Sequence, residues 1–277
     1  MLSVTELIHI ALAEDIGPKD ITTENLVSPG EMGRGMIVAK EPLTLAGMDV
    51  VREVFLQLDG GTTFSSRFSD GDTVQTGDTV LEIYGAMRTL LMGERTALNF
   101  LQHLSGIATH VRGYVDEIGG KPVRLTDTRK TTPGLRNLEK YAVRVGGAYN
   151  HRMGLYDGVL IKDNHIAACG GIIPAIHKIR DRVSHLVKIE VETADLAQVR
   201  DALNAGADVI MLDNMNVDQI KEAVAEIKGR AIVEVSGGVS RINLAELADT
   251  GIDIISVGAL THSARSVDLS MRIQPVD

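Results

Sequence analysis

Short apolar runs alternate with helical stretches through the second half of the chain. Runs such as VRLTD (from Val123), DVIMLDN (from Asp208) and AIVEVSGG (from Ala231) have the length and composition of buried strands. Helical segments such as DLAQVRDALNAG and VDQIKEAVAEIKG lie between them. This alternation predicts parallel strands joined by crossover helices.

The spacing of these strands favours a barrel of the triosephosphate isomerase type. Strands recur about every 20 to 35 residues, and only six are clear, so we expect the barrel to be incomplete. A doubly wound open sheet remains the alternative, because periodicity alone does not separate the two. Polar residues gather at the strand ends, which is where such barrels keep their chemistry.

The first hundred residues have a different pattern, with one helix, several strand-like segments and turns. Ser3 and Glu6 are spaced as a capping box for a helix with apolar positions at Val4, Leu7, Ile8, Ala11 and Leu12. Strand-like runs follow at 33–47, 62–74 and 78–85. A long amphipathic helix is predicted from about Glu94 to Ile118, ended by Gly119 and Gly120.

Composition and charge exclude several classes of protein. The net charge of −9 and the 3% aromatic content disfavour a nucleic-acid partner. No run of about 18 apolar residues is present and the N-terminus lacks a basic signal-peptide region, so we expect no membrane association. Cys169 is the only cysteine, which fits a reducing compartment and a cytoplasmic location.

Basic residues are concentrated in one segment of this acidic chain. Between Arg124 and Arg152 there are seven basic residues and two acidic ones, so the segment carries a charge of +5. Gly, Pro and Thr interrupt it, which argues against the alternative of a simple solvated helix face. We interpret the segment as a site for a small, highly charged anion.

The strand ends together offer the groups of a phosphate-handling enzyme. Arg129, Lys130 and Lys162 are cations there, and Glu190, Glu192 and Asp213 are carboxylates that can hold Mg²⁺ or form salt bridges. Glycine-containing turns at 236–238 and 258–259 follow the last two strands, where barrels often bind phosphate, although plain turns are the alternative. No Walker loop, G-x-S-x-G elbow or Cys/His metal spacing occurs.

At these residues the chain closely resembles quinolinate phosphoribosyltransferase, from end to end. The resemblance is carried by EDIGPKDIT, GERTALNFLQHLSGIAT, KIEVE, IMLDNM, EVSGG and SVGALTHS, and above all by the 39 residues from Asp127 to His165. It implies an open, seven-stranded α/β barrel with an N-terminal α/β sandwich domain. The implied domains are 1–106, with 266–277 returning to it, and 107–265. The implied activity is the transfer of phosphoribosyl from phosphoribosyl pyrophosphate (PRPP) to quinolinate with loss of carbon dioxide, in NAD biosynthesis.

The resemblance also implies a role for each site residue. Quinolinate is expected to contact Arg129, His151 and Arg152, and also Arg95 from the other subunit of a homodimer, which itself could assemble further. Lys130 and Lys162 are expected to bridge quinolinate and PRPP, and Glu192 and Asp213 to hold the ribose hydroxyls and Mg²⁺, directly or through water. The remaining expected substrate contacts are Thr128, Ser236, Gly237, Gly238, Gly258, Ala259 and Leu260.

Three rival functions stay open from the residues alone. A related phosphoribosyltransferase could act on nicotinate or another anionic acceptor, although the crowding of Arg129, His151 and Arg152 favours a diacid. A Schiff-base aldolase could use Lys162, a lysine at a barrel strand end. A non-catalytic anion-binding protein is the third, and carboxylates beside the cations argue against it because they would weaken anion binding.

Overall fold

The computed structural model describes residues 3–276, which form two compact units interleaved along the chain. One unit takes the described residues up to Arg112 together with Thr132–Gly147 and those from Ser263 onward. The other takes Gly113–Thr131 and Ala148–His262. Because 132–147 belongs with the N-terminal residues, these units differ from the domains 1–106, with 266–277 returning to it, and 107–265, which stay a prediction. Residues 1, 2 and 277 of those domains lie outside the described residues.

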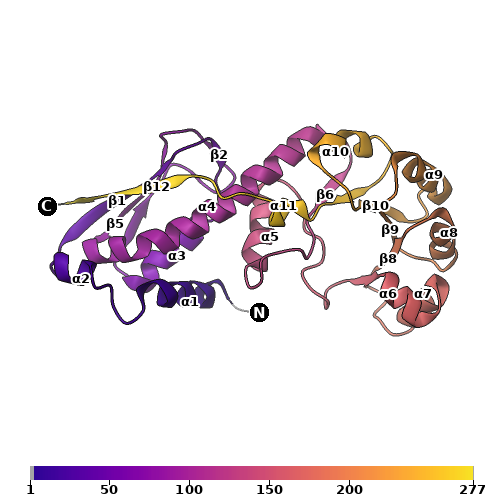
Figure 1. Cartoon of the computed structure of the whole chain (residues 1–277), viewed down its shortest axis with the longest axis horizontal. Coiled ribbons are helices and arrows are strands. Elements are labelled where there is room, and N and C mark those ends of the chain that lie inside the picture. The colour runs from indigo at the N-terminus through magenta and orange to yellow at the C-terminus, as the bar shows by residue number, and fades with distance from the viewer. Residues whose placement is uncertain (1–2, 277) are drawn as a thin grey trace. The chain divides into compact units, whose positions relative to one another are not determined.

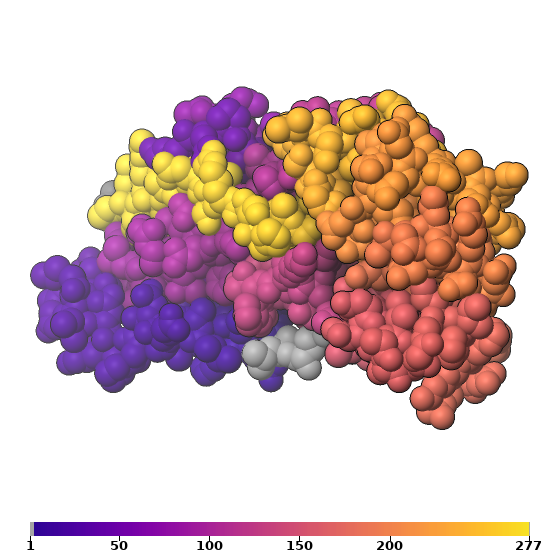
Figure 2. Space-filling model, turned by 45° about the vertical axis from the view of Figure 1, so that its right-hand side comes forward, coloured from indigo at the N-terminus to yellow at the C-terminus, as the bar shows by residue number. Residues whose placement is uncertain are grey.

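The first unit is an antiparallel sheet covered by helices (Figure 1). The strand order is β12-β1-β5-β3, so the C-terminal strand pairs with the first one. In the space-filling view the yellow C-terminal segment lies against the magenta helix α4, where Gln102 Nε2 donates to Leu269 O at 2.8 Å (Figure 2). The strands are β1 (Met32–Ala39), β2 (Leu43–Thr44), β3 (Thr63–Ser65), β4 (Thr73–Val74), β5 (Thr79–Ala86) and β12 (Leu269–Pro275), with β2 and β4 forming a separate pair.

The helices of this unit begin where local sequence allows. The capping box of α1 is confirmed, because Ser3 N donates to Glu6 Oε2 at 2.7 Å and Glu6 N donates to Ser3 Oγ at 3.2 Å. The predicted start of the long helix at Glu94 is wrong: β5 runs directly into α4 at Met87. Gly93 lies within α4, although glycine normally indicates a helix end. Glycine is required there because a Cβ at this position would lie 2.6 Å from the Phe55 ring. The helices are α1 (Val4–Ile16), α2 (Thr23–Leu26), α3 (Met48–Leu58), α4 (Met87–Ile118), which ends in the second unit, and α5 (Arg136–Val145).

The second unit is an open α/β barrel built from the six strands that the sequence predicts. All neighbouring strands are parallel, and the order is β6-β11-β10-β9-β8-β7. The first strand therefore pairs with the last, as in a barrel, whereas a doubly wound sheet would reverse its strand order at a switch point. The strands are β6 (Arg124–Thr126), β7 (Val159–Ile161), β8 (Ile189–Thr193), β9 (Val209–Asp213), β10 (Ile232–Ser236) and β11 (Ile254–Ser256).

A seventh position extends this sheet beyond β6. Tyr149 forms a single parallel bridge to Thr126, which is all that the described residues show of a seventh strand. Helices lie on the outer side of the strands (Figure 1). They are α6 (Asp163–Cys169), α7 (Ile172–Arg180), α8 (Leu196–Asn204), α9 (Val217–Ile227) and α10 (Arg241–Ala248), and the short α11 (Ala259–His262) follows β11.

The barrel places chain segments that are far apart in sequence at one common rim. Strand cores such as Ile189, Val191, Ile210 and Leu212 are fully buried, so the polar residues that follow them are carried to the carboxyl ends of the strands. Among residues 3–276, we find no helix long and apolar enough to cross a membrane.

Candidate active site

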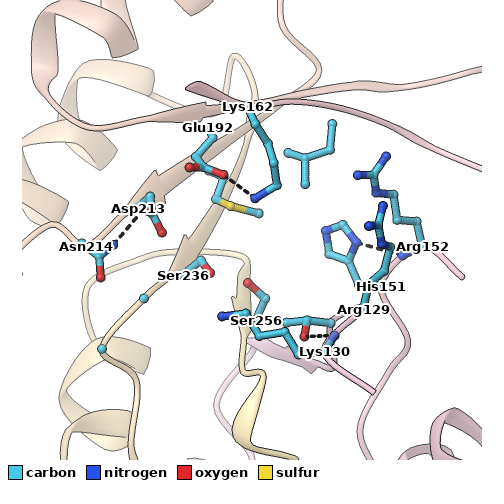
Figure 3. A pocket seen from close by; sticks show the side chains of 15 residues that line it. Arg129, Lys130, His151, Arg152, Lys162, Glu192, Asp213, Asn214, Ser236 and Ser256 are labelled. Carbon is cyan, nitrogen blue, oxygen red and sulfur yellow. Dashed lines mark hydrogen bonds and ion pairs between the residues drawn. The ribbon is translucent and has the colours of Figure 1, made fainter. Parts of the chain in front are cut away.

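A cavity of about 580 Å³ opens at the carboxyl ends of the barrel strands (Figure 3). Residues in or just beyond strands β7 to β11 contribute to its lining, together with the segments after β6 and Tyr149. It is lined by Thr128, Arg129, Lys130, His151, Arg152, Leu160, Lys162, Glu192, Met211, Asp213, Asn214, Ser236, Gly237, Gly238 and Ser256.

One side of the cavity is cationic. Lys130 is held through its backbone, since its N–H donates to Thr128 Oγ1 at 3.0 Å and its carbonyl accepts from Thr261 Oγ1 at 2.7 Å. The Arg152 guanidinium donates to Gly158 O at 3.0 Å. Partial burial and the positive charge of Arg129 lower the pKa of Arg152. Two guanidinium groups that disfavour each other's charge are stabilised when an anion binds between them.

A buried aspartate fixes the segment that carries His151 and Arg152. Asp127 is fully buried directly after β6. Its carboxylate accepts from Asn150 Nδ2 at 2.6 Å and from His151 N at 2.9 Å. His151 Nδ1 in turn accepts from Arg152 N at 2.8 Å. Three consecutive residues are thus tied to the end of the first barrel strand, which gives the Arg152 side chain a defined origin at the cavity.

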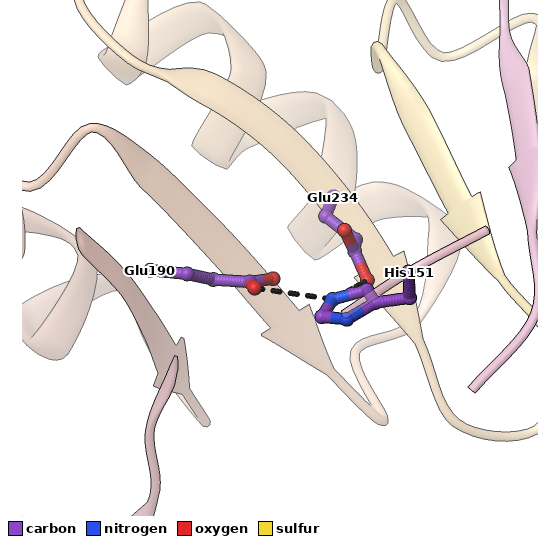
Figure 4. Close-up of side chains that lie close together, drawn as sticks. All are labelled: His151, Glu190 and Glu234. Carbon is purple, nitrogen blue, oxygen red and sulfur yellow. Dashed lines mark ion pairs between the residues drawn. The ribbon is translucent and has the colours of Figure 1, made fainter. Parts of the chain in front are cut away.

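His151 also belongs to a buried cluster with two glutamates (Figure 4). His151 Nε2 is 3.1 Å from Glu190 Oε2 and 3.5 Å from Glu234 Oε1. Burial, reinforced by the negative charge of Glu190, raises the pKa of Glu234 to about 7. This is also the one group of three His, Cys, Asp or Glu side chains with metal-binding spacing that we find among residues 3–276.

The opposite side of the cavity pairs a cation with carboxylates. Lys162 Nζ lies 2.9 Å from Glu192 Oε2, and the Lys162 side chain stays about half exposed. Asp213, at the end of the neighbouring strand, accepts from Asn214 Nδ2 at 2.7 Å. Carboxylate oxygens at two adjacent strand ends are suitable ligands for a hard cation that shares its shell with substrate phosphates.

A glycine turn closes this side of the cavity. Gly237 has φ +83°, and a Cβ there would lie 2.2 Å from Asn214 Oδ1. Asn214 itself is left-handed at φ 54° and donates its N–H to Ser236 O at 3.0 Å. The turn is therefore tightly packed backbone, and glycine is required at 237 by both conformation and space.

The structure brings most of the predicted site residues together. Eleven of the fifteen line the cavity: Thr128, Arg129, Lys130, His151, Arg152, Lys162, Glu192, Asp213, Ser236, Gly237 and Gly238. Gly258, Ala259 and Leu260 do not. Gly258 lies beside the Lys130 side chain, where a Cβ would be 2.9 Å from Cδ, and the Leu260 side chain is fully buried. Arg95 is exposed on α4, in the other compact unit.

Sequence reasoning missed two groups beside this cavity. Asp127 was counted only as an acid in the basic segment, and Glu234 was not singled out at all. The sequence did contain a signal for Glu234. Successive side chains of a strand point to opposite faces, so Glu234 lies on the face opposite to that of Val233 and Val235. Leu160, Met211, Asn214 and Ser256 complete the lining.

Comparisons with known proteins agree along the whole chain. The C-terminal domain model of quinolinate phosphoribosyl transferase matches residues 107–272, and the N-terminal domain model matches residues 20–105. A probable nicotinate-nucleotide pyrophosphorylase [carboxylating] of Bacillus subtilis is 44% identical over 273 residues, covering 98% of this chain and 94% of that protein. The nicotinate-nucleotide pyrophosphorylase [carboxylating] of Mycobacterium leprae is 43% identical, covering 96% of this chain and 95% of that protein.

A solved structure supports the same assignment. The crystal structure of NadC from Streptococcus pyogenes superposes with a TM-score of 0.96 at 43% sequence identity, covering 100% of this chain and 99% of that one. The superposed region includes both compact units and therefore every residue that lines the cavity. The chain belongs to the quinolinate phosphoribosyl transferase family.

Proposed function

We propose that this protein transfers the phosphoribosyl group of PRPP to quinolinate and releases carbon dioxide, giving nicotinate mononucleotide and pyrophosphate. The observation that carries the proposal is the division of one barrel-end cavity into a guanidinium side and a carboxylate–glycine side. The first suits a small diacid, and the second suits a phosphorylated ribose. The family to which the chain belongs gives the same reading.

The acceptor is proposed to bind at Arg129, Arg152 and Lys130. Quinolinate carries two adjacent carboxylates, and planar guanidinium groups can fork onto such oxygens. Partial burial and, after it, repulsion by Arg129 lower the pKa of Arg152, and a dianion bound between the two arginines relieves that repulsion. His151 contributes its ring carbons in the present conformation, because Nδ1 accepts from Arg152 N and Nε2 faces the two buried glutamates.

The donor is proposed to bind on the opposite side. Glu192 and Asp213 would hold the ribose hydroxyls and Mg²⁺, and their oxygen donors at adjacent strand ends fit that ion. When bound, Mg²⁺ neutralises charge on the pyrophosphate. The 236–238 turn offers backbone N–H groups to a phosphate, since side chains are absent at Gly237 and Gly238.

The chemistry then requires positioning more than covalent participation. The bond between ribose C1 and the pyrophosphate oxygen breaks, leaving an oxocarbenium-like centre that nearby carboxylates stabilise. The pyridine nitrogen attacks C1. Its positive charge then draws the electrons of the adjacent C–COO⁻ bond as carbon dioxide leaves, and the ring carbon takes up a proton. Holding both reactants in line is worth about 7–11 kcal/mol in favourable cases.

The structure weakens the aldolase alternative. A Schiff-base lysine has to attack with its free amine, whereas Lys162 Nζ is engaged by Glu192 at 2.9 Å. That contact favours a role as a cation that approaches phosphate or carboxylate.

Relative turnover of two acids tests the proposal. With PRPP and Mg²⁺ present, kcat/KM for quinolinate should exceed that for nicotinate on the order of 100-fold, because the missing carboxylate leaves charged donors unpaired. Comparable values for both acids would contradict the assignment of quinolinate as substrate. No product from either acid would contradict the reaction class.

We further propose a homodimer in which Arg95 completes the site of the partner chain. Arg95 is 61% exposed on α4 and does not line its own cavity, and a two-fold pair would use the same helix twice. The test is to mix an inactive Arg95→Ala chain with an inactive Lys130→Ala chain. After verified subunit exchange, a shared site should restore up to about a quarter of wild-type activity, since half of the chains enter heterodimers with one intact site of two. Absence of any recovery would refute the shared site and leave the reaction unaffected.

A further inference from the structure

The two buried glutamates that face His151, Glu190 and Glu234, have no part in the proposed reaction. Glu190 is 8% exposed and Glu234 is 2% exposed, so two acidic groups lie out of water beside His151, the residue before Arg152. His151 and Arg152 line both the cavity at the strand ends and a second one of about 240 Å³ that reaches Glu190 and Glu234. The cluster is therefore close enough to affect an anion at the arginines.

The tautomer of His151 decides what this cluster can bind. Nδ1 accepts from the backbone N–H of Arg152 at 2.8 Å, so it carries no proton. The proton of the neutral ring is then on Nε2, the atom that faces both glutamates. A histidine that ligates a metal through Nε2 normally keeps its proton on Nδ1 and donates it to an acceptor. Here Nδ1 accepts a hydrogen bond instead of donating one, so the cluster favours binding of a proton over binding of a metal ion.

The charges around the cluster require one of the carboxyls to be neutral. The titratable groups closest to Glu234 are Glu190 from β8 and His151 from the segment after Tyr149. Met211 is the β9 residue paired with Glu234, and Glu192 of β8 and Asp213 of β9 lie nearer the carboxyl ends of the strands. On the other side, β11 presents Ser256. Arg152, Asp157 and Lys188 line the same small cavity. With His151 neutral, two ionised glutamates here would be a buried like-charge pair. Glu234 is the more buried of the two, so burial and the charge of Glu190 make it the neutral one; they raise its pKa even against the lowering that a positive His151 would cause.

We propose that Glu234 is a positioning residue whose protonated form supports His151 and permits the acid acceptor to bind, and whose ionisation weakens that binding. An ionised Glu234 would add a second buried negative charge near the arginines that hold the acceptor. Binding of a dianion should therefore be coupled to protonation of Glu234. This inference rests on the proposed function for the identity of the acceptor.

Calorimetry of quinolinate binding tests the coupling without catalysis. Aromatic carboxylates are ionised throughout pH 6.0–8.5, so the ligand itself does not titrate. The dissociation constant of the wild type should rise about tenfold across this range, which corresponds to one unit of pKa displacement on binding. Repeating the titration at pH 7.5 in buffers of different ionisation enthalpy should reveal proton uptake on binding.

The variants separate Glu234 from other groups. Glu234→Gln should bind quinolinate at pH 8.5 as tightly as the wild type does at pH 6.0, with no proton uptake. Glu226→Gln, on the outer helix α9, is the matched control and should keep the wild-type pH dependence. Proton uptake that persists unchanged in Glu234→Gln would overturn the proposal. Calorimetric binding of zinc by the wild type that is lost in this variant would also overturn it.

One further measurement needs no variant. In carbon-13 NMR of glutamate-labelled wild type, one carboxyl signal should titrate near pH 7 and remain protonated at that pH with quinolinate bound. Absence of such a signal would overturn the inference even if Glu234→Gln does not fold. Wild type that binds no quinolinate at pH 6.0 would instead contradict the proposed function, whereas binding without proton uptake would contradict this inference alone.

Discussion

Replacing Glu234 by glutamine should stabilise the folded protein at neutral and alkaline pH. In the unfolded chain this carboxyl loses its proton near pH 4.5, and in the folded chain near pH 7, because burial and Glu190 oppose its ionisation. Between these values the folded state binds more protons, so the group's contribution to stability falls as the pH rises. Below pH 4.5 there is no penalty, and above pH 7 it is complete.

The size of the effect follows from the two pKa values. A tenfold change in proton affinity corresponds to about 1.4 kcal/mol, so a rise from 4.5 to about 7 costs the folded state about 3 kcal/mol once Glu234 is ionised. Glutamine has the same shape as the protonated acid and carries no charge, so it avoids this cost. The variant should gain little at pH 5 and about 3 kcal/mol at pH 8 relative to the wild type.

Guanidinium unfolding followed by circular dichroism at pH 5, 6, 7 and 8 provides the measurement. We compare the free energy of unfolding of the variant with that of the wild type at each pH. Contributions of other acids are the same in both proteins and cancel; one such acid is Glu41, whose pKa is lowered to about 2 by its hydrogen bond with Arg265. Glu226→Gln is the control, because its ion pair with Arg200 is on the surface. A difference that does not change with pH would refute the reasoning.

Three further changes probe the rest of the cavity. Arg129→Lys or Arg152→Lys should each lower kcat/KM for quinolinate about tenfold or more, because the fork geometry is lost while the charge is kept; steady-state kinetics equal to wild type would contradict the diacid site. Glu192→Ala and Asp213→Ala should weaken PRPP binding more than quinolinate binding in separate calorimetric titrations, and the reverse pattern would exchange the two sides. Gly237→Ala should destabilise the protein by about 2 kcal/mol and impair PRPP binding, since its Cβ meets a neighbouring side-chain oxygen at 2.2 Å; unchanged melting and binding would show the turn to be adaptable.

The barrel was predictable because its signals are local. Each strand is a short apolar run, and the residues after it are polar, so strands β6 to β11 could be inferred, although periodicity alone left a barrel and a doubly wound sheet both open. The start of α4 could not, because Gly93 in its first turns is a helix-breaking signal whose cause, contact with Phe55, is a tertiary one. The assignment of α5 to the first compact unit also depends on packing that the local sequence does not express.

The cavity was predictable to the extent that strand ends converge. Lys162 follows β7 and Glu192 lies next to the carboxyl end of the adjacent β8, and the resulting ion pair at 2.9 Å is a consequence of parallel topology. Glu234 was not predictable in this way, because it lies within a strand and its environment depends on what the segment after Tyr149 inserts into the barrel. The local sequence contains no signal that His151 packs against Glu234 inside the barrel.

The release of carbon dioxide tests the central claim most directly. Quinolinate labelled in the carboxyl group adjacent to the ring nitrogen is incubated with wild-type protein, PRPP and Mg²⁺, and labelled carbon dioxide is counted against nicotinate mononucleotide. We expect equal molar amounts of the two products and neither product when PRPP is omitted. Mononucleotide that retains the label, or carbon dioxide released without PRPP, would contradict a decarboxylation driven by the quaternised ring nitrogen.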